Sequence, residues 1–173
     1  MTRPLFTPIR LRDLEIRNRL WVPPMCQYSC EARDGVPHGW QFQHLGARAA
    51  GGFGIVVAEA TAVTPEGRIS PWDTGLWNDE QRDAWARIVT FMHTQGAKAG
   101  IQLAHAGRKA STYRDWSGHG SVPVEVHLLA TQERASEEPY AEIVQVLLGL
   151  EQIRGQGAHA RSKCREPARD QRR

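Results

Sequence analysis

The sequence predicts an α/β fold built on a parallel β-sheet. Three observations support this prediction: short runs of β-branched and apolar residues alternate with amphipathic segments of helical period, turn residues stand at the junctions, and the order is strand, helix, strand, helix, strand. This alternation implies right-handed crossovers between parallel strands. The pattern leaves open whether the sheet is a doubly wound layer or the start of a barrel. No Gly-x-Gly-x-x-Gly turn follows the first strand, which counts against a dinucleotide-binding open sheet.

The first elements are short. Apolar residues alternate within residues 9–16 and predict a hairpin with its turn near Arg12, which we expect to act as a lid outside the main sheet. An apolar burst at residues 19–22 predicts the first buried strand. Pro23 and Pro24 end that strand and lead into a loop.

Two helices are expected between the later strands. Residues 38–50 place Phe42, Leu45 and Ala49 on one face, and Gly51-Gly52 closes this helix. A second helix begins at Asn78, with Gln81 completing a capping box, and ends at Gly96.

Two strands surround the second helix. Residues 54–60 form a β-branched run that is too short for a helix and uniformly apolar at its centre, as expected of a parallel strand buried on both faces. Residues 99–104 predict the third strand. Each strand gives way to a loop at its carboxyl end, where α/β proteins place their sites.

The character of the chain changes near Val124. All six tryptophans and all four phenylalanines precede this point, so the remainder has little material for a core of its own. Residues 138–153 predict one amphipathic helix, and disorder is expected beyond Gly155. We therefore divide the chain into residues 1–124 and a tail of atypical, largely helical or disordered character at residues 125–173.

Composition excludes several classes. The net charge of +3 is mild, and the basic residues cluster only at the C-terminus without interleaved aromatic residues, which is more typical of a solvated tail than of a nucleic-acid site. No apolar run approaches the roughly 18 residues that a membrane helix needs. Prolines near the N-terminus and an odd cysteine count predict a cytoplasmic protein without disulfides. The spacing of Cys26 and Cys30 is weak support for zinc, and no metal is expected.

The loop after the first strand is the first candidate site. Pro23 and Pro24 make its backbone rigid, so that Met25 and the thiol of Cys26 are held in place before a ligand binds. A flavin ring needs such a flat wall with a polarisable side chain near its reactive nitrogen. The alternative is that Cys26 is a small buried apolar residue.

The other two strand ends supply the remaining candidates. Ala60 would let a planar ligand approach the backbone, but from the residues alone an ordinary packing alanine is the favoured account. Glu59 is most simply a partner in a salt bridge. Gln102 places an amide within an apolar strand. This amide can donate to a ring carbonyl and accept from a ring N–H, which matches the pyrimidine edge of a flavin, unless neighbouring backbone groups satisfy it.

Several blocks, in order, resemble the old yellow enzyme family, and within it the branch of xenobiotic reductases and NADPH dehydrogenases. The blocks are Leu5-Phe6-Thr7-Pro8-Ile9, Asn18-Arg19-Leu20, Pro24-Met25-Cys26-Gln27-Tyr28-Ser29, Gly52-Phe53-Gly54, Glu59-Ala60-Thr61-Ala62-Val63, Gly67-Arg68-Ile69-Ser70 and Gln102-Leu103-Ala104-His105-Ala106-Gly107-Arg108-Lys109. The resemblance spans Leu5 to about Pro123. It implies that the sheet is part of a (β/α)8 TIM barrel, with about three of its βα units present.

The resemblance also implies a function. FMN would lie at the carboxyl ends of the strands, would be reduced by NADPH or NADH, and would be reoxidised by an electron-poor alkene. The implied flavin contacts are Pro23, Pro24, Met25, Cys26, Ala60 and Gln102. Tyr28 would face the substrate, and neither a nucleic acid nor a membrane is an expected partner.

The resemblance leaves some family features unmatched. The His pair and the proton-donating Tyr of the family have no counterpart here, so we assign no catalytic residue, and we interpret the change near Val124 as a frameshift or a truncated gene. Two readings stay open: an FMN-dependent oxidoreductase in incomplete and inactive form, or a non-catalytic half-barrel or interaction protein that needs a partner. The oligomeric state, homo-oligomer included, is not decided by the sequence.

Overall fold

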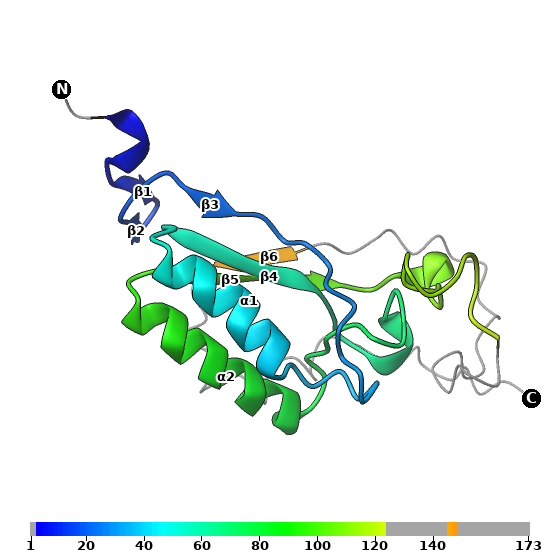
Figure 1. Ribbon diagram of the computed structural model, residues 1–173. Coiled ribbons are helices and arrows are strands. Elements are labelled where there is room, and N and C mark those ends of the chain that lie inside the picture. The colour runs from blue at the N-terminus through cyan, green and yellow to red at the C-terminus, as the bar shows by residue number, and fades with distance from the viewer. Residues whose placement is uncertain (1–2, 124–144, 149–173) are drawn as a thin grey trace, which may run out of the picture.

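The computed structural model describes residues 3–123 and 145–148. Its main sheet has four strands in the order β3-β4-β5-β6, and the first three run parallel. The strands are β3 (Trp21–Val22), β4 (Ile55–Ala62), β5 (Lys98–Ala104) and β6 (Gln145–Leu148). Helices α1 (Gly39–Ala50) and α2 (Asp79–Thr94) lie side by side on one face of this sheet (Figure 1). The predicted alternation of strand and helix is confirmed.

Both helices begin as their sequences require. Asn78 caps α2, its side chain accepting from the Gln81 backbone while Gln81 bonds back, which confirms the predicted capping box. His38 forms the equivalent box with Gln41 at the start of α1. Gly96, at a φ of 75°, follows the last turn of α2 in the left-handed conformation that glycine tolerates best.

The core lies between the helices and the sheet. It is built from buried apolar side chains of α1, α2 and one face of β3, β4 and β5. Its members are Val22, Leu45, Ala49, Val56, Ala58, Trp85, Ile88, Val89, Met92, Ala97, Ala99 and Ile101. Every residue of β4 is buried, as predicted for a strand covered on both faces.

A two-stranded hairpin closes the opposite face of the sheet at one end. Strands β1 (Ile9–Leu11) and β2 (Leu14–Ile16) pair antiparallel, and Arg12 adopts a left-handed φ of 52° in the turn between them. The hairpin packs on Ile55 and Val57 at the start of β4. It therefore covers the amino ends of the parallel strands, and the loops that follow their carboxyl ends lie on the far side of the molecule (Figure 1).

Short 3₁₀ turns complete the described elements. They are Pro4–Phe6, Pro65–Gly67 and Gly107–Lys109. No helix in the described ranges is both long and apolar enough to cross a membrane.

The prediction of a helix over residues 138–153 is wrong at residues 145–148. These residues form β6, which pairs antiparallel with β5 between Gly100↔Leu148 and Leu103↔Gln145. The physical reason is that β5 offers an edge of unpaired backbone groups, and pairing with a short apolar segment satisfies them more directly than an isolated helical turn could. The rest of the predicted helix, and the disorder expected beyond Gly155, fall outside the described residues.

Candidate functional site

Three segments meet at the carboxyl ends of the parallel strands. The loop of residues 23–30 follows β3, residues 63–78 follow β4, and residues 105–123 follow β5 (Figure 1). All the candidates from the sequence lie at this end. No group of three metal-ligating side chains occurs among the described residues.

A β-bulge sets the direction in which the end of β4 faces. Ala58 pairs with Ile101, but the next pair is Ala60 with Gln102, so Glu59 is the extra residue. Ala58 and Ile101 belong to the helix-side core, and Gln102, one residue on from Ile101, therefore points to the other face. As its register partner, Ala60 shares that face.

The thiol of Cys26 joins the loop to this pair. It is half-buried and makes hydrogen bonds to the Tyr28 side chain and to the backbone of Ala60. Burial is the main cause that raises its pKa, and the nearby charge of Asp73 adds to it, so the thiol stays protonated at neutral pH. The structure thus brings Cys26, Ala60 and Gln102 together on one side of the fold.

The remaining loop candidates are more open. Pro23 and Met25 are exposed and Pro24 is half-buried. The carbonyl of Met25 accepts from Nε2 of Gln27 at 2.8 Å, and Oε1 of Gln27 accepts from the Trp40 indole at 3.2 Å. The first bond lies within the loop and the second ties the loop to helix α1, in addition to the restraint that the prolines give.

Tyr28 is held in an unusual conformation. Its φ of 48° lies in the left-handed region, which costs roughly 1–2 kcal/mol for a residue with a Cβ. Its carbonyl accepts from Nη1 of Arg114 at 3.1 Å, and its ring lies 6.3 Å from that of Trp116. Burial raises the pKa of its phenol, and the neighbouring Cys26 adds to the effect. Tyr28 is therefore fixed beside Cys26 as a neutral hydroxyl.

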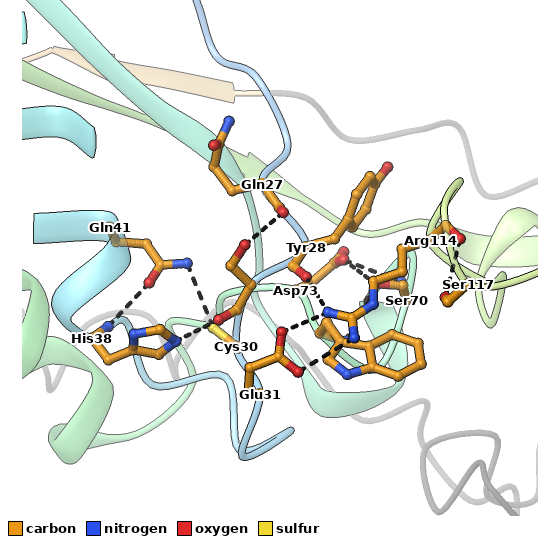
Figure 2. A network of polar contacts seen from close by, with 12 residues as sticks. Gln27, Tyr28, Cys30, Glu31, His38, Gln41, Ser70, Asp73, Arg114 and Ser117 are labelled. Atoms are coloured by element: carbon orange, nitrogen blue, oxygen red, sulfur yellow. Dashed lines mark hydrogen bonds and ion pairs between the residues drawn. The ribbon is translucent and has the colours of Figure 1, made fainter. Parts of the chain in front are cut away.

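Arg114 connects two of the segments and was not predicted. Its guanidinium pairs with Glu31 at 2.7 Å and lies over the ring of Trp72, 4.4 Å from the ring centroid (Figure 2). Its Nε is buried without a hydrogen-bond partner among the described residues. Arg114 lies 83 residues from Glu31 in the chain, so no local pattern could have indicated this contact.

A buried carboxylate lies below the same loop. Glu59 is 4% exposed, and its Oε2 accepts from the Gln27 backbone N–H at 2.7 Å while Oε1 accepts from the Gln41 amide at 3.4 Å. The described residues do not form the expected salt bridge at Glu59, since its hydrogen-bond partners, the backbone of Gln27 and Tyr28 and the side chain of Gln41, are all neutral amides. Burial raises the pKa of Glu59 to about 7 against the opposing effect of these hydrogen bonds.

A second buried carboxylate, Asp73, shapes the neighbouring segment. It accepts from the backbone N–H of Ile69 at 2.7 Å. It also accepts from the Ser70 hydroxyl at 2.7 Å (Figure 2). Burial raises its pKa to about 6, opposed first by these hydrogen bonds and then by the nearby Arg68. The guanidinium of Arg68 is itself buried, donates to the carbonyls of Arg33 and Pro71, and lies over the Trp77 ring.

Comparison with known proteins identifies the family. The sequence profile of the NADH:flavin oxidoreductase / NADH oxidase family matches residues 4–148. The chain belongs to this family. The match continues past Pro123 and includes β6, while the division of the chain at residue 124 stays a prediction.

Curated relatives in this flavin oxidoreductase family are NADPH dehydrogenases. Those of Listeria monocytogenes serotype 4a and Listeria innocua are each 56% identical over 106 residues, which is 61% of this chain and 31% of the relative. The chain thus spans about a third of the length of the curated relatives that it matches.

Solved structures agree with the sequence comparison. Morphinone reductase in complex with tetrahydroNAD is 32% identical with a TM-score of 0.58, covering 64% of this chain and 29% of that one. The old yellow enzyme homologue from Zymomonas mobilis is 33% identical with a TM-score of 0.58, covering 63% and 30%. The described fold is therefore part of a TIM barrel of the old yellow enzyme type, and the family's cofactors are FMN and NAD(P)H.

The residues at the carboxyl ends fit a flavin ring. The amide of Gln102 is half-buried and makes no hydrogen bond to another described residue. Ala60 beside it has no side chain beyond Cβ that would keep a flat ring away, and the Cys26 thiol lies at the edge of the same surface.

Proposed function

We propose that this chain is the FMN-binding N-terminal part of an NAD(P)H-dependent oxidoreductase of the ene-reductase type. The observation that supports it most is the meeting of Cys26, Ala60 and Gln102 across a β-bulge. A half-buried amide, a small residue and a neutral thiol on one surface match the needs of an isoalloxazine ring better than those of a packed core.

The proposal gives each candidate a role. Gln102 would bind the pyrimidine edge of the ring, and Ala60 would allow close approach to the backbone of β4. The segment Pro23-Pro24-Met25-Cys26 would line the ring, with the thiol as a weak donor near its reactive nitrogen. When bound, FMN would supply hydride transfer between NADPH or NADH and an electron-poor alkene.

Tyr28 is proposed to face the substrate. Its carbonyl is held by Arg114 and its hydroxyl by Cys26, so the ring would present a fixed neutral surface to a small molecule. We propose no proton donor, because the residues that the resemblance associates with that step lie outside the matched blocks. Residence in the cytoplasm and a homo-oligomeric state stay predictions.

A second function is supported by one observation. The described sheet has β3 and β6 at its edges in place of the closed ring of a barrel. Such edges present backbone groups for pairing, so the alternative is an inactive half-barrel fragment, or an interaction protein, that needs a partner.

Binding of FMN to the purified chain separates the two functions. We expect quenching of FMN fluorescence on titration with the protein, and Gln102→Leu should weaken the affinity roughly tenfold because the ring edge would lose its hydrogen bonds. Gln43→Leu, at an exposed position on α1, is the matched control and should bind like the wild type. A bound flavin that NADPH reduces supports the oxidoreductase. A colourless, self-associating chain that leaves FMN fluorescence unchanged supports the fragment.

A further inference from the structure

Glu59 contacts the loop of the candidate site from the helix side of the sheet, opposite to the face that Ala60 and Gln102 share. The bulge that directs Ala60 to the ligand face directs Glu59 to the helix side, where its carboxylate reaches Gln41 of α1 and the backbone of Gln27. Its side chain is buried, so these contacts are shielded from water.

Consecutive residues of β4 hold consecutive residues of the loop. The Glu59 carboxylate accepts the N–H of Gln27, and the Ala60 backbone bonds the thiol of Cys26. The N–H of Gln27 belongs to the peptide bond that carries the Cys26 carbonyl. The loop is thus fixed on both sides of this peptide bond by two neighbouring residues of one strand.

The charges around Glu59 favour this positioning role over an ion pair. Asp73 lies on the 63–78 segment and Cys26 and Cys30 on the loop, and all three interact electrostatically with Glu59 without supplying a positive charge. Helix α1 contributes the neutral amide of Gln41. The buried carboxylate is therefore stabilised mainly by the hydrogen bond from the Gln27 N–H, which is its shortest. The same hydrogen bond fixes the position of the Gln27 backbone.

We propose that Glu59 is a positioning residue of the flavin site, which anchors the peptide bond between Cys26 and Gln27 so that Cys26 stays against Ala60. The inference rests on the proposed function, since it assigns to Glu59 the geometry of a flavin wall. It differs from a simple packing role in one respect: the essential atom is a hydrogen-bond acceptor, and the volume of the side chain is secondary.

The test compares variants that keep the acceptor with variants that remove it. Glu59→Gln retains an oxygen for the Gln27 N–H, whereas Glu59→Leu fills the space without one. In the full chain, NMR hydrogen exchange of the Gln27 amide should become roughly tenfold faster in Glu59→Leu, and FMN affinity should fall roughly tenfold, while Glu59→Gln stays within about threefold of the wild type in both. Thr61→Val removes a buried hydroxyl on the same strand, which forms hydrogen bonds with the Thr74 hydroxyl and the Glu59 carbonyl, and it should leave Gln27 unchanged.

The outcomes distinguish the inference from the proposed function. Unchanged Gln27 exchange in Glu59→Leu, or FMN binding that this variant does not weaken, overturns the role of Glu59 alone. A wild-type chain that binds no FMN overturns the proposed function and this role with it. Should Glu59→Leu fail to fold, Glu59→Asp replaces it: the shorter carboxylate cannot reach Gln27, so the same loss of protection and affinity is expected, and wild-type behaviour in both measurements would refute the inference.

Discussion

The two ends of the parallel sheet differ in the polarity of their buried side chains. At the amino ends, the hairpin covers Ile55 and Val57 with apolar side chains. At the carboxyl ends, two carboxylates are buried and a thiol and an amide are left partly open. Burying carboxylates costs free energy, whereas burying aliphatic side chains supplies it. We therefore expect the stability of the fold to depend mainly on the amino ends of the strands and ligand binding to depend on their carboxyl ends.

The largest effect is expected at the hairpin. Ile16 is fully buried between the hairpin and β4, so Ile16→Ala should lower the free energy of unfolding by about 2–5 kcal/mol through lost burial and a cavity. Urea denaturation measures this change. The folded fraction should bind FMN with wild-type affinity, because the hairpin lies at the other end of the strands from Gln102.

A substitution of similar size at the carboxyl ends allows the loss of stability to be compared between the two ends. Val63 follows β4 and is 40% exposed, so Val63→Ala should change the free energy of unfolding by less than about 0.5 kcal/mol. If Ile16→Ala instead impairs FMN binding by the folded protein as much as Gln102→Leu does, the two ends are not independent.

The second effect is a pH dependence that arises at the carboxyl ends. The pKa of Glu59 is about 7 in the folded state, above its value of 4.5 in the unfolded chain, so folding favours the protonated form. Its stabilising contribution is fully present below pH 4.5 and is lost as the pH rises through 7. Asp73, with a pKa of about 6, acts in the same direction.

The substitution Glu59→Gln isolates this effect. The variant should be more stable than the wild type at pH 8 by about 1–3 kcal/mol, and the difference should shrink as the pH falls to 5. Burial lowers the pKa of His44, so the contribution of this residue to the free energy of unfolding decreases as the pH falls. This contribution is the same in the wild type and in Glu59→Gln, so it cancels in the difference between them. Urea denaturation at several pH values measures the difference, and a constant difference across this range would contradict a raised pKa at Glu59.

The sequence predicts the elements well because their signals are local. The capping box of Asn78 and Gln81 lies within four residues, and the apolar run of β4 identifies a strand without knowledge of its neighbours. Because every residue of β4 is buried, its sequence does not show a regular alternation that would indicate which face of the sheet each residue occupies. The bulge at Glu59 depends on the register with β5, so the sequence could name Ala60 and Gln102 as candidates but could not show that they are partners.

The missed contacts share one property, namely the distance along the chain. Arg114 reaches the Tyr28 carbonyl across 86 residues, and Arg17 reaches Gln95 across 78. A long arginine side chain can donate to any backbone carbonyl that the fold places within its reach. The sequence pattern around the arginine does not indicate which carbonyl that will be. The strand β6 was missed for a related reason, since the edge of β5 decides its conformation.

The smallest effect concerns Arg17 at the amino ends. Its guanidinium donates to Gln95 at 2.6 Å, to Phe53 at 2.8 Å and to Ala49 at 3.0 Å, so one side chain satisfies backbone carbonyls at the ends of both helices. Positive charge there also complements the helix dipoles. We expect Arg17→Ala to lower the free energy of unfolding by about 1–2 kcal/mol, and Arg17→Lys to recover less than half, because an ammonium group cannot reach three separate carbonyls at once.

A substitution at Gly96 also tests the contact between Arg17 and the end of α2. A Cβ at Gly96 would lie 2.9 Å from Nη1 of Arg17, in addition to the strain of its positive φ. Gly96→Ala should therefore be more damaging in the wild type than in Arg17→Ala, where only the backbone strain remains. A double-mutant cycle in urea measures the difference, and strictly additive effects would mean that Arg17 does not hold the end of α2 as the structure places it.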